Sequence, residues 1–317
     1  MMKKLITKLG LLGGALFWGM NASALELELR EGHDLVGQVE IIEARYEDTF
    51  AELGQKFGLG YTEMLLANPQ VDPWLPGEGT QVVLPHQFLL PSGPRQGIVV
   101  NLAEYRLYYY TNKGSVLTYA IGIGTDESPT PLTQTRVRAK IPNPAWYPPE
   151  SIRRKYAAEG NFLPAVVPPG PENPLGPLKI QLDLPSYLIH GSNKSFGIGT
   201  QVSHGCIRMY NRDVLELAKI LPVGTSVRFI NEPIKLGLSG DDLLIELHAF
   251  DQPDHPDQIR QLRIDAVRAL AAFEKEHGPM LIDARKLEEA VSRVSGIPEL
   301  IGQKARMTAS GLLQPRS

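Results

Sequence analysis

The sequence predicts a mostly β protein, with a β-sandwich-like central domain, a small α+β module before it and a helical extension after it. Apolar or β-branched runs of strand length recur between residues 97 and 230. A strand, helix, helix, strand pattern precedes them at 38–86, and helical periodicity follows at 239–304. The 26 Pro and 30 Gly among 317 residues favour short strands and turns over long helices.

The composition excludes several function classes. Hydrophobic residues make up 43% of the chain and charged residues 21%, a balance typical of a folded globular protein. Lys and Arg number 32 against 35 Asp and Glu, so the net charge of −3 offers no basic surplus for a nucleic-acid partner. Cys206 is the only cysteine, which excludes an intramolecular disulfide and a multi-thiolate metal site. We expect no cofactor.

Residues 1–24 have the pattern of a cleaved export signal. A positive start precedes an apolar run at 9–20 and a small-x-small ending, Ala22-Ser23-Ala24. The positive residues are Lys3, Lys4 and Lys8. The run is shorter than the roughly 20 apolar residues of a spanning helix, which makes a membrane anchor the weaker alternative. We predict cleavage after Ala24, a periplasmic location and no membrane span in the mature chain.

The pattern at 38–86 predicts a compact module that precedes the central domain. Helical periodicity covers Asp48 to Phe57 and then Thr62 to Ala67, where the Thr62 hydroxyl can cap the second helix. A short strand at Gln81 to Pro85 closes the module.

This segment resembles a LysM module. The matching motifs are Tyr46-Glu47-Asp48-Thr49 at the first helix, Asn68-Pro69-x-Val71 after the second, and Leu75-Pro76-Gly77 with Val82-x-Leu84-Pro85 in the closing strand. Glu47 stands where LysM modules usually have Gly. The resemblance implies binding of glycan that contains N-acetylglucosamine. The alternative is a small packing domain without a ligand.

Six strands and one helix are expected in the central domain, residues 96–231. The strands are 97–102, 105–110, 116–123, 178–182, 187–189 and 226–230. The helix, Asn211 to Leu221, has its apolar side chains on one face and stops at Pro222. Residues 140–177 contain ten Pro. We expect so long and stiff a loop to be a functional lid over the sheet.

The extension at 239–304 is expected to be helical and to carry no chemistry. Amphipathic patterns predict helices at 257–276 and 283–294, after one short strand at Leu243 to Leu247. We expect the apolar helix faces to pack on the central domain. The tail, 305–317, is expected to be disordered.

The residues best suited to chemistry lie in Ser203-His204-Gly205-Cys206-Ile207-Arg208, with His190 sixteen residues before the cysteine. A free thiol has a pKa of about 8.5 and needs a base or a positive neighbour to become a nucleophile. A neutral imidazole can take the thiol proton and then hold the thiolate. His190 and His204 are both candidates, and we favour His190 because it ends an apolar strand that can aim it.

The neighbours of Cys206 suggest supporting roles. Gly205 lets the backbone approach a carbonyl, which would leave the N–H groups of Gly205 and Cys206 for a developing oxyanion. Arg208 can bind a substrate carboxylate or lie in a salt bridge that shapes the loop. Zinc is the alternative use of two His and one Cys, but no carboxylate falls within 191–209, so we expect no metal.

The segment His190-Gly191, followed by Ser203-His204-Gly205-Cys206-Ile207-Arg208-Met209, closely resembles the signature of the L,D-transpeptidase (YkuD-like) family. The resemblance covers about 96–231. It implies that Cys206 is the nucleophile, that His190 is the base with its ring oriented by the Gly191 carbonyl, and that the backbone of 204–206 forms the oxyanion hole. Many members have Thr-Pro-x-Gly where this chain has Thr130-Pro131-Leu132-Thr133, which puts the substrate groove in question.

The resemblance also implies a substrate. Cys206 would attack the bond between diaminopimelate and D-Ala in a peptidoglycan tetrapeptide, release D-Ala and pass the acyl group to an amine. That amine belongs to a second stem peptide or to a Lys of an envelope lipoprotein. Two alternatives stay open from the sequence: a cysteine amidase or L,D-carboxypeptidase that uses water, and a non-catalytic glycan-binding protein.

Overall fold

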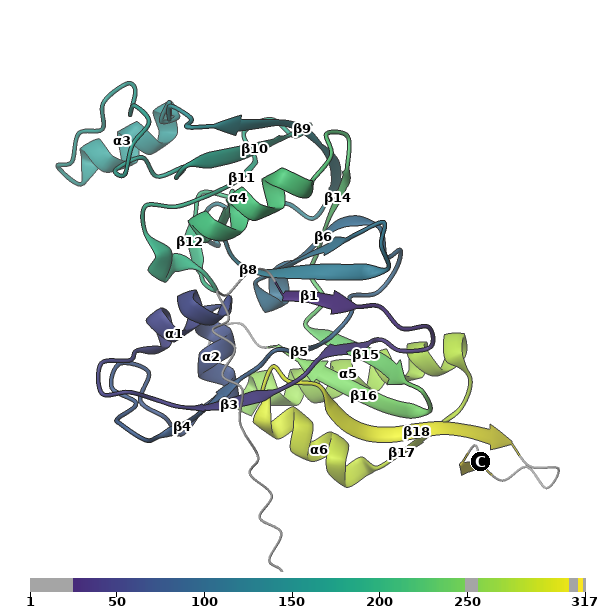
Figure 1. Cartoon of the computed structure of the whole chain (residues 1–317). Helices are drawn as coiled ribbons and strands as arrows, with labels where there is room; N and C mark the ends of the chain where they lie inside the picture. Colours follow the sequence, from purple (N-terminus) through teal and green to yellow (C-terminus); the bar gives the residue numbers. More distant parts are fainter. Residues whose placement is uncertain (1–24, 249–255, 308–312, 316–317) are drawn as a thin grey trace, which may run out of the picture.

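The computed structural model describes residues 25–248, 256–307 and 313–315 (Figure 1). The predicted export signal, 1–24, lies outside the described residues. No helix in the described part of the chain is long and apolar enough to cross a membrane.

The central domain is one sheet that closes on itself, instead of two separate sheets. Eight strands follow one another in the order β8-β13-β11-β10-β9-β14-β6-β7, and β7 pairs again with β8. The strands are β6 (Gly97–Asn101), β7 (Arg106–Tyr110), β8 (Ser115–Gly124), β9 (Gln134–Pro142), β10 (Leu178–Leu182), β11 (Leu188–His190), β13 (Ile207–Met209) and β14 (Ser226–Ile230). Two further strands, β1 (Leu25–Glu28) and β12 (Gln201–Ser203), pair with β8. All six predicted strands are present, whereas β9, β13 and the two additional strands were not predicted.

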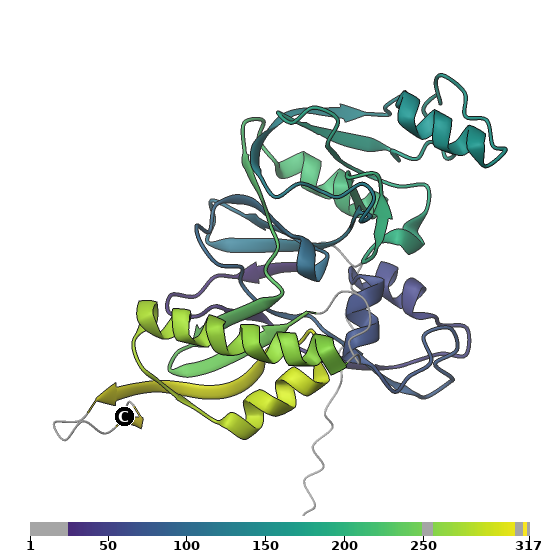
Figure 2. The ribbon, with the colours of Figure 1, turned by 180° about the vertical axis from the view of Figure 1, so that it is seen from behind.

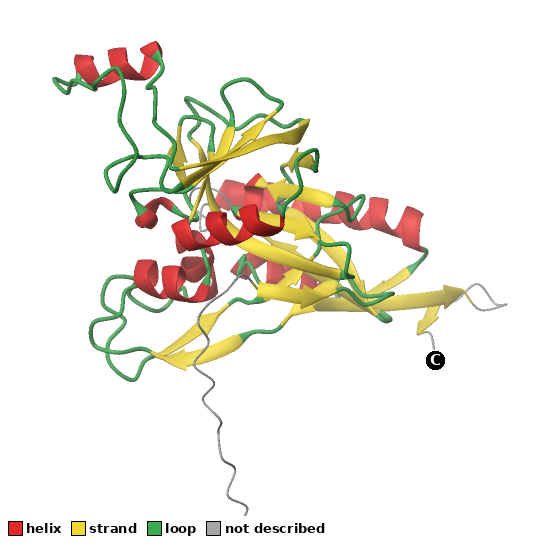
Figure 3. Cartoon of the chain, turned by 45° about the horizontal axis from the view of Figure 1, so that its top comes forward, coloured by secondary structure: helices red, strands yellow, loops and turns green. Residues whose placement is uncertain are grey.

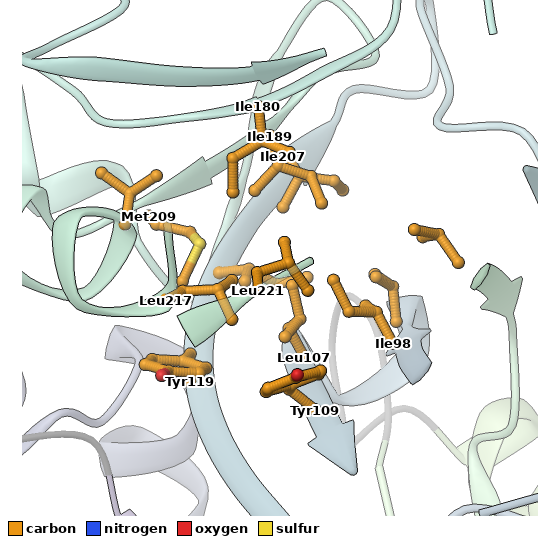
Figure 4. Close-up of a cluster of buried hydrophobic side chains, with 14 of the residues drawn as sticks. Ile98, Leu107, Tyr109, Tyr119, Ile180, Ile189, Ile207, Met209, Leu217 and Leu221 are labelled. Carbon is orange, nitrogen blue, oxygen red and sulfur yellow. The ribbon is translucent and has the colours of Figure 1, made fainter. Parts of the chain in front are cut away.

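The core of this domain lies inside the closed sheet. Inward side chains from all eight strands meet in one buried cluster, to which the helix α4 (Asn211–Ile220) adds Val214, Leu217 and Ala218 (Figure 4). Ile189 of β11 and Ile207 of β13 are at most 1% exposed within it. This packing fixes both strands that lead to the predicted site.

The N-terminal module has the predicted strand, helix, helix, strand order. It consists of β3 (Glu40–Glu43), α1 (Phe50–Phe57), α2 (Tyr61–Ala67) and β4 (Gln81–Leu84), with β3 and β4 antiparallel. The strands β2 (Leu35–Gly37) and β5 (Gln87–Leu89) flank it and pair with each other. Gly60 caps α2, which makes the expected cap at Thr62 wrong: the Glu63 carboxylate accepts the Gly60 N–H at 2.5 Å.

The C-terminal extension is not purely helical, so that prediction is wrong. Five strands form a sheet whose one face is covered by α5 (Pro256–His277) and α6 (Ala284–Arg293) (Figure 2). The strands are β15 (Ile234–Ser239), β16 (Asp242–Leu247), β17 (Met280–Ile282), β18 (Glu299–Met307) and β19 (Leu313–Pro315). The apolar helix faces therefore pack on this sheet instead of the central domain.

The predicted disorder of 305–317 is also wrong where the structure describes the tail. Ala305 to Met307 continue β18, and β19 pairs with them in antiparallel register. The preceding part of β18 pairs with β16 and β17, which are remote in the sequence, and the Ala305 N–H donates to the Pro279 carbonyl at 2.9 Å. No local pattern shows this pairing. Residues 308–312 and 316–317 lie outside the described part.

The Pro-rich stretch 140–177 contains a helix that the sequence analysis did not predict. This helix, α3 (Glu150–Ala158), stands on an arm beyond β9 and β10 (Figure 3). A bridge between Trp146 and Val167 closes the base of the arm. The Phe162 side chain is 85% exposed on it. The role of this arm as a lid stays a prediction.

Candidate active site

The predicted base ends β11, and the predicted nucleophile immediately precedes β13, the strand beside it. β11 and β13 are parallel, with Ile189 opposite Ile207 and His190 opposite Arg208. Because side chains alternate along a strand and Ile189 and Ile207 face the core, His190 and Arg208 face the other side of the sheet. Cys206 immediately precedes β13, so the same alternation places it with Arg208. The register thus brings together residues that are sixteen positions apart in the sequence.

His190 is held in one orientation. Its side chain is buried, and Nδ1 lies 2.6 Å from the carbonyl oxygen of Gly191. A carbonyl only accepts, so Nδ1 carries the proton and Nε2 is left as the acceptor. Burial lowers the pKa of His190 to about 4, and the hydrogen bond to Gly191 opposes that effect only in part. The imidazole is therefore neutral at neutral pH.

Gly191 is required for this arrangement. A Cβ at this position would lie 2.4 Å from Oδ1 of Asn211 and 2.9 Å from Cδ of Pro177. Asn211 Oδ1 also accepts the Ser192 N–H at 2.8 Å. The carbonyl that orients His190 is thus fixed from both sides, and the sequence analysis had not identified Asn211.

Cys206 is half-buried, and its Sγ lies 3.5 Å from the carbonyl oxygen of Ser186. Burial raises the pKa of the Cys206 thiol, while a hydrogen bond from the Leu188 N–H and the charge of Arg208 act against this shift. The resting group is consequently a protonated thiol, and it needs a base when it reacts.

The turn before Cys206 is tied by side-chain hydrogen bonds. Ser203 Oγ donates to the Cys206 carbonyl at 2.6 Å and accepts the Gly205 N–H at 3.1 Å. The expectation that the Gly205 N–H is free for an oxyanion is therefore wrong, because the Ser203 side chain folds back onto it. Gly205 has a φ of +96°, and a Cβ there would lie 2.8 Å from the ring of Tyr187.

Thr130 is a further residue of the site that sequence reasoning missed. Its Oγ1 donates to the Gly205 carbonyl at 2.9 Å and accepts the Gly124 N–H at 3.0 Å. Thr130 belongs to the turn Thr130-Pro131-Leu132-Thr133, which departs from the family pattern. Its place in that motif could have identified it as a residue of the site. A cleft of about 420 Å³ opens beside it, lined in part by Gly124, Leu132 and Gln201.

The two remaining predicted residues differ in exposure. His204 is exposed as a residue. Partial desolvation of its ring lowers its pKa, and the positive charges of Lys155 and Arg208 lower it further. Arg208 is partly buried, and its buried Nε has no hydrogen-bond partner among the described atoms. No carboxylate of the described residues forms an ion pair with Arg208, which leaves the predicted salt bridge without a partner.

A second cluster of titratable groups includes none of the residues of this site. Glu104, Glu246 and His248 place one ligand atom each within 4.8 Å of one another. The Nζ of Lys235 lies between them, 2.6 Å from Glu104 and 2.7 Å from Glu246. The lysine supplies the positive charge that a metal ion would bring to this cluster.

Comparison with known proteins gives the family. Residues 95–229 match the model of the L,D-transpeptidase catalytic domain. The chain is 39% identical to the probable L,D-transpeptidase ErfK/SrfK of Salmonella typhimurium, over 84% of this chain and 88% of that protein. It is 38% identical to the probable L,D-transpeptidase YbiS of Escherichia coli, over 87% of this chain and 92% of that protein. The chain belongs to the L,D-transpeptidase family, whose members remodel peptidoglycan.

A solved L,D-transpeptidase from Mycobacterium smegmatis covers 48% of this chain and 63% of its own, with a TM-score of 0.34 and 15% identity. The range that matches the L,D-transpeptidase family model, 95–229, differs by one or two residues at each end from the range predicted for the catalytic domain, 96–231. All residues of the site described above lie within that transpeptidase domain.

Proposed function

We propose that this L,D-transpeptidase acts in the periplasm, with Cys206 as nucleophile and His190 as base. Cys206 attacks the carbonyl that joins the L-centre of diaminopimelate to D-Ala in a tetrapeptide stem. D-Ala leaves, and the acyl group remains on sulfur as a thioester. An amine then attacks the thioester, forms the new amide and frees the thiol.

The observation that supports this most is the pairing of β11 with β13. This pairing puts His190 and Cys206 on the face of the sheet that is turned away from the core. Nε2 of His190 is left to accept a proton. A neutral imidazole beside a protonated thiol is suited to take the proton as sulfur attacks. The imidazolium formed in this step then gives its proton to the nitrogen of the departing D-Ala. In the second half-reaction, the imidazole takes a proton from the attacking amine and returns it to the departing sulfur of Cys206.

The Cys206 N–H is our candidate for the oxyanion contact, because the Gly205 N–H is engaged by Ser203. We assign substrate binding to Arg208. Its buried Nε lacks a partner among the described atoms, and a carboxylate would satisfy it with a charge-assisted bond. The stem peptide offers carboxylates on diaminopimelate and on D-Ala.

We further propose that the N-terminal module binds the glycan strand. Tyr46 and Trp74 are 71% and 69% exposed, and both lie within or beside the motifs that resemble a LysM module. Exposed aromatic rings offer an apolar face with a polar edge, which suits sugar rings. Loss of glycan pull-down in a Trp74→Ala variant of the full chain tests this assignment, with Tyr147→Ala, a change of an exposed aromatic residue outside the module, as control.

One assay tests the reaction and its alternatives. The purified mature chain is incubated with a disaccharide tetrapeptide, and the products are weighed by mass spectrometry. A cross-linked or exchanged product supports a transpeptidase. Tripeptide without such a product shows a hydrolase that uses water, and an unchanged substrate shows a non-catalytic protein. Adding a peptide with a free Lys amine then tests an envelope lipoprotein as acceptor.

A further inference from the structure

The segment that leads into the catalytic turn lies between the central sheet and the N-terminal module. On one side it is bonded to β8: the Gly199 N–H donates to Ile121 at 2.9 Å, and the Ile123 N–H donates to Thr200 at 3.0 Å. Immediately afterwards β12 pairs with β8 as far as Ser203, whose hydroxyl holds the Cys206 carbonyl. Displacement of Gly199 would therefore move the turn that carries the thiol.

On the other side, α2 of the module holds the same segment. The Tyr61 N–H donates to the Ile198 carbonyl at 3.1 Å. Thr62 Oγ1 donates to the Gly199 carbonyl at 2.6 Å, and the Thr62 N–H lies 3.4 Å from the same oxygen. Three donors at the start of one helix thus converge on two consecutive carbonyl groups.

The contact depends on two glycines. A Cβ on Gly60 would lie 2.7 Å from the Cα of Gly199, and a Cβ on Gly199 would lie 2.5 Å from the Cα of Gly60. Gly199 also has a φ of +85°, a conformation that other residues rarely adopt. The two backbones are therefore closer than any side chain would allow.

The module also holds the chain just after the motif. The hydroxyl of Tyr210 donates to the Leu59 carbonyl at 2.9 Å. The six residues from Ser203 to Arg208 are consequently bracketed by module contacts, at Ile198 and Gly199 before them and at Tyr210 after them.

A buried ion pair keeps α2 in place. The Glu63 carboxylate receives two hydrogen bonds from the fully buried Arg106 of β7, at 2.5 and 2.7 Å. Its Oε2 also accepts the Gly60 N–H. The start of α2 is thus attached to the same closed sheet that carries His190.

We propose that the N-terminal module is a positioning element of the transpeptidase site and that Thr62 is its positioning residue. Through Gly199 it sets the path of 198–203 and hence the place of Cys206 relative to His190. This inference rests on the proposed function only for the roles of those two residues. It goes beyond glycan binding, because it gives the module a task in the chemical step.

The test uses the full mature chain with three substitutions. Thr62→Val removes the hydroxyl donor at nearly constant shape, and Thr62→Ser keeps the donor as the matched control. Gly60→Ala inserts a methyl group against the backbone of Gly199. For each, kcat and KM are measured for D-Ala release, the rate of Cys206 alkylation by iodoacetamide is measured by mass spectrometry, and the melting temperature is recorded.

We expect kcat to fall about 10–100-fold in Gly60→Ala and about 3–10-fold in Thr62→Val, with KM nearly unchanged, because small misplacements of reacting groups are costly. Alkylation should slow in both variants, and Thr62→Ser should behave as wild type. The proposal would be overturned if folded Gly60→Ala and Thr62→Val had the kcat and the alkylation rate of the wild type. It would also be overturned if a lower melting temperature were the only change in these variants. If Gly60→Ala does not fold, the two Thr62 variants decide.

The alkylation arm separates this inference from the proposed function. Iodoacetamide needs no peptidoglycan, so the rates report the placement and ionisation of Cys206 even if the chain releases no D-Ala. An inactive wild type with the expected alkylation differences would reject the proposed reaction and keep the positioning role.

Discussion

His190 donates from Nδ1 to the carbonyl oxygen of Gly191 at 2.6 Å, and this bond fixes the ring of the proposed base. Burial lowers the pKa of the same histidine to about 4. Burial thus favours a neutral imidazole, and the hydrogen bond places its proton on Nδ1, so that Nε2 can accept a proton. This site therefore begins its reaction with neutral groups instead of a standing ion pair.

The two histidines are predicted to contribute unequally. His190→Ala should lower the rate of D-Ala release about 10²–10⁴-fold, as loss of a general base usually does. His204→Ala should cost less, because the His204 side chain is exposed and the turn is held by Ser203 and Thr130. Steady-state rates of both variants check this, with Cys206→Ala as the inactive reference. A larger loss in His204→Ala would show that the base is wrongly assigned.

The reactivity of Cys206 should rise steeply with pH. Burial raises the pKa of this thiol, and only the thiolate reacts with iodoacetamide. We expect the alkylation rate of Cys206 to keep increasing from pH 7 through pH 9, with no label on Cys206→Ala. A rate that is already level between pH 6 and pH 8 would indicate a thiolate stabilised by His190, contrary to the neutral resting site.

His190 should make the protein less stable in mild acid. Its pKa is about 6.5 in the unfolded chain and about 4 in the fold, so between these values the unfolded state binds more protons. The free energy of unfolding should therefore fall as the pH drops from about 6.5 to 4, by about 3 kcal/mol in total.

The His190→Gln variant isolates this contribution. Burial raises the pKa of Asp213 to about 6, which acts in the opposite direction because the fold then binds the proton. Asp213 is present in both proteins, so the difference between their denaturant curves at pH 7 and pH 4 reports His190 alone. An equal loss of stability in wild type and His190→Gln would contradict the prediction.

Arg208 is predicted to act on substrate binding. Arg208→Met should lower kcat/KM about 10–100-fold, the usual cost of a hydrogen bond to a charged group. Arg208→Lys keeps the charge without the planar fork and should fall between this variant and wild type. A tetrapeptide whose carboxylates are amidated should show little difference among the three proteins. If it shows the full difference, Arg208 acts on the site itself and not on the substrate.

The local pattern of the chain was enough for much of the fold and for the choice of site. Apolar runs predicted six of the eight strands of the closed sheet, and the motif residues led to the proposed pair of His190 and Cys206. The extension was misread because its helical periodicity was given most weight and only Leu243 to Leu247 was identified as a strand. β15 alternates apolar and other residues and could have been found, whereas β18 is stabilised by pairing with β16, β17 and β19, which no local pattern shows. Gly205 was misread because its N–H is engaged by a serine side chain whose direction the sequence does not show.

The sequence by itself determined the family and the choice of Cys206 and His190 as the proposed nucleophile and base, because these follow from residue types at fixed spacing. Only the tertiary structure decided that His190 is neutral, that Arg208 lacks an acidic partner among the described residues, and that Thr62 bonds to Gly199 from 137 residues away. Burial, strand register and domain contacts depend on groups that are remote along the chain. Their effects on pKa and position arise only when folding brings those groups together.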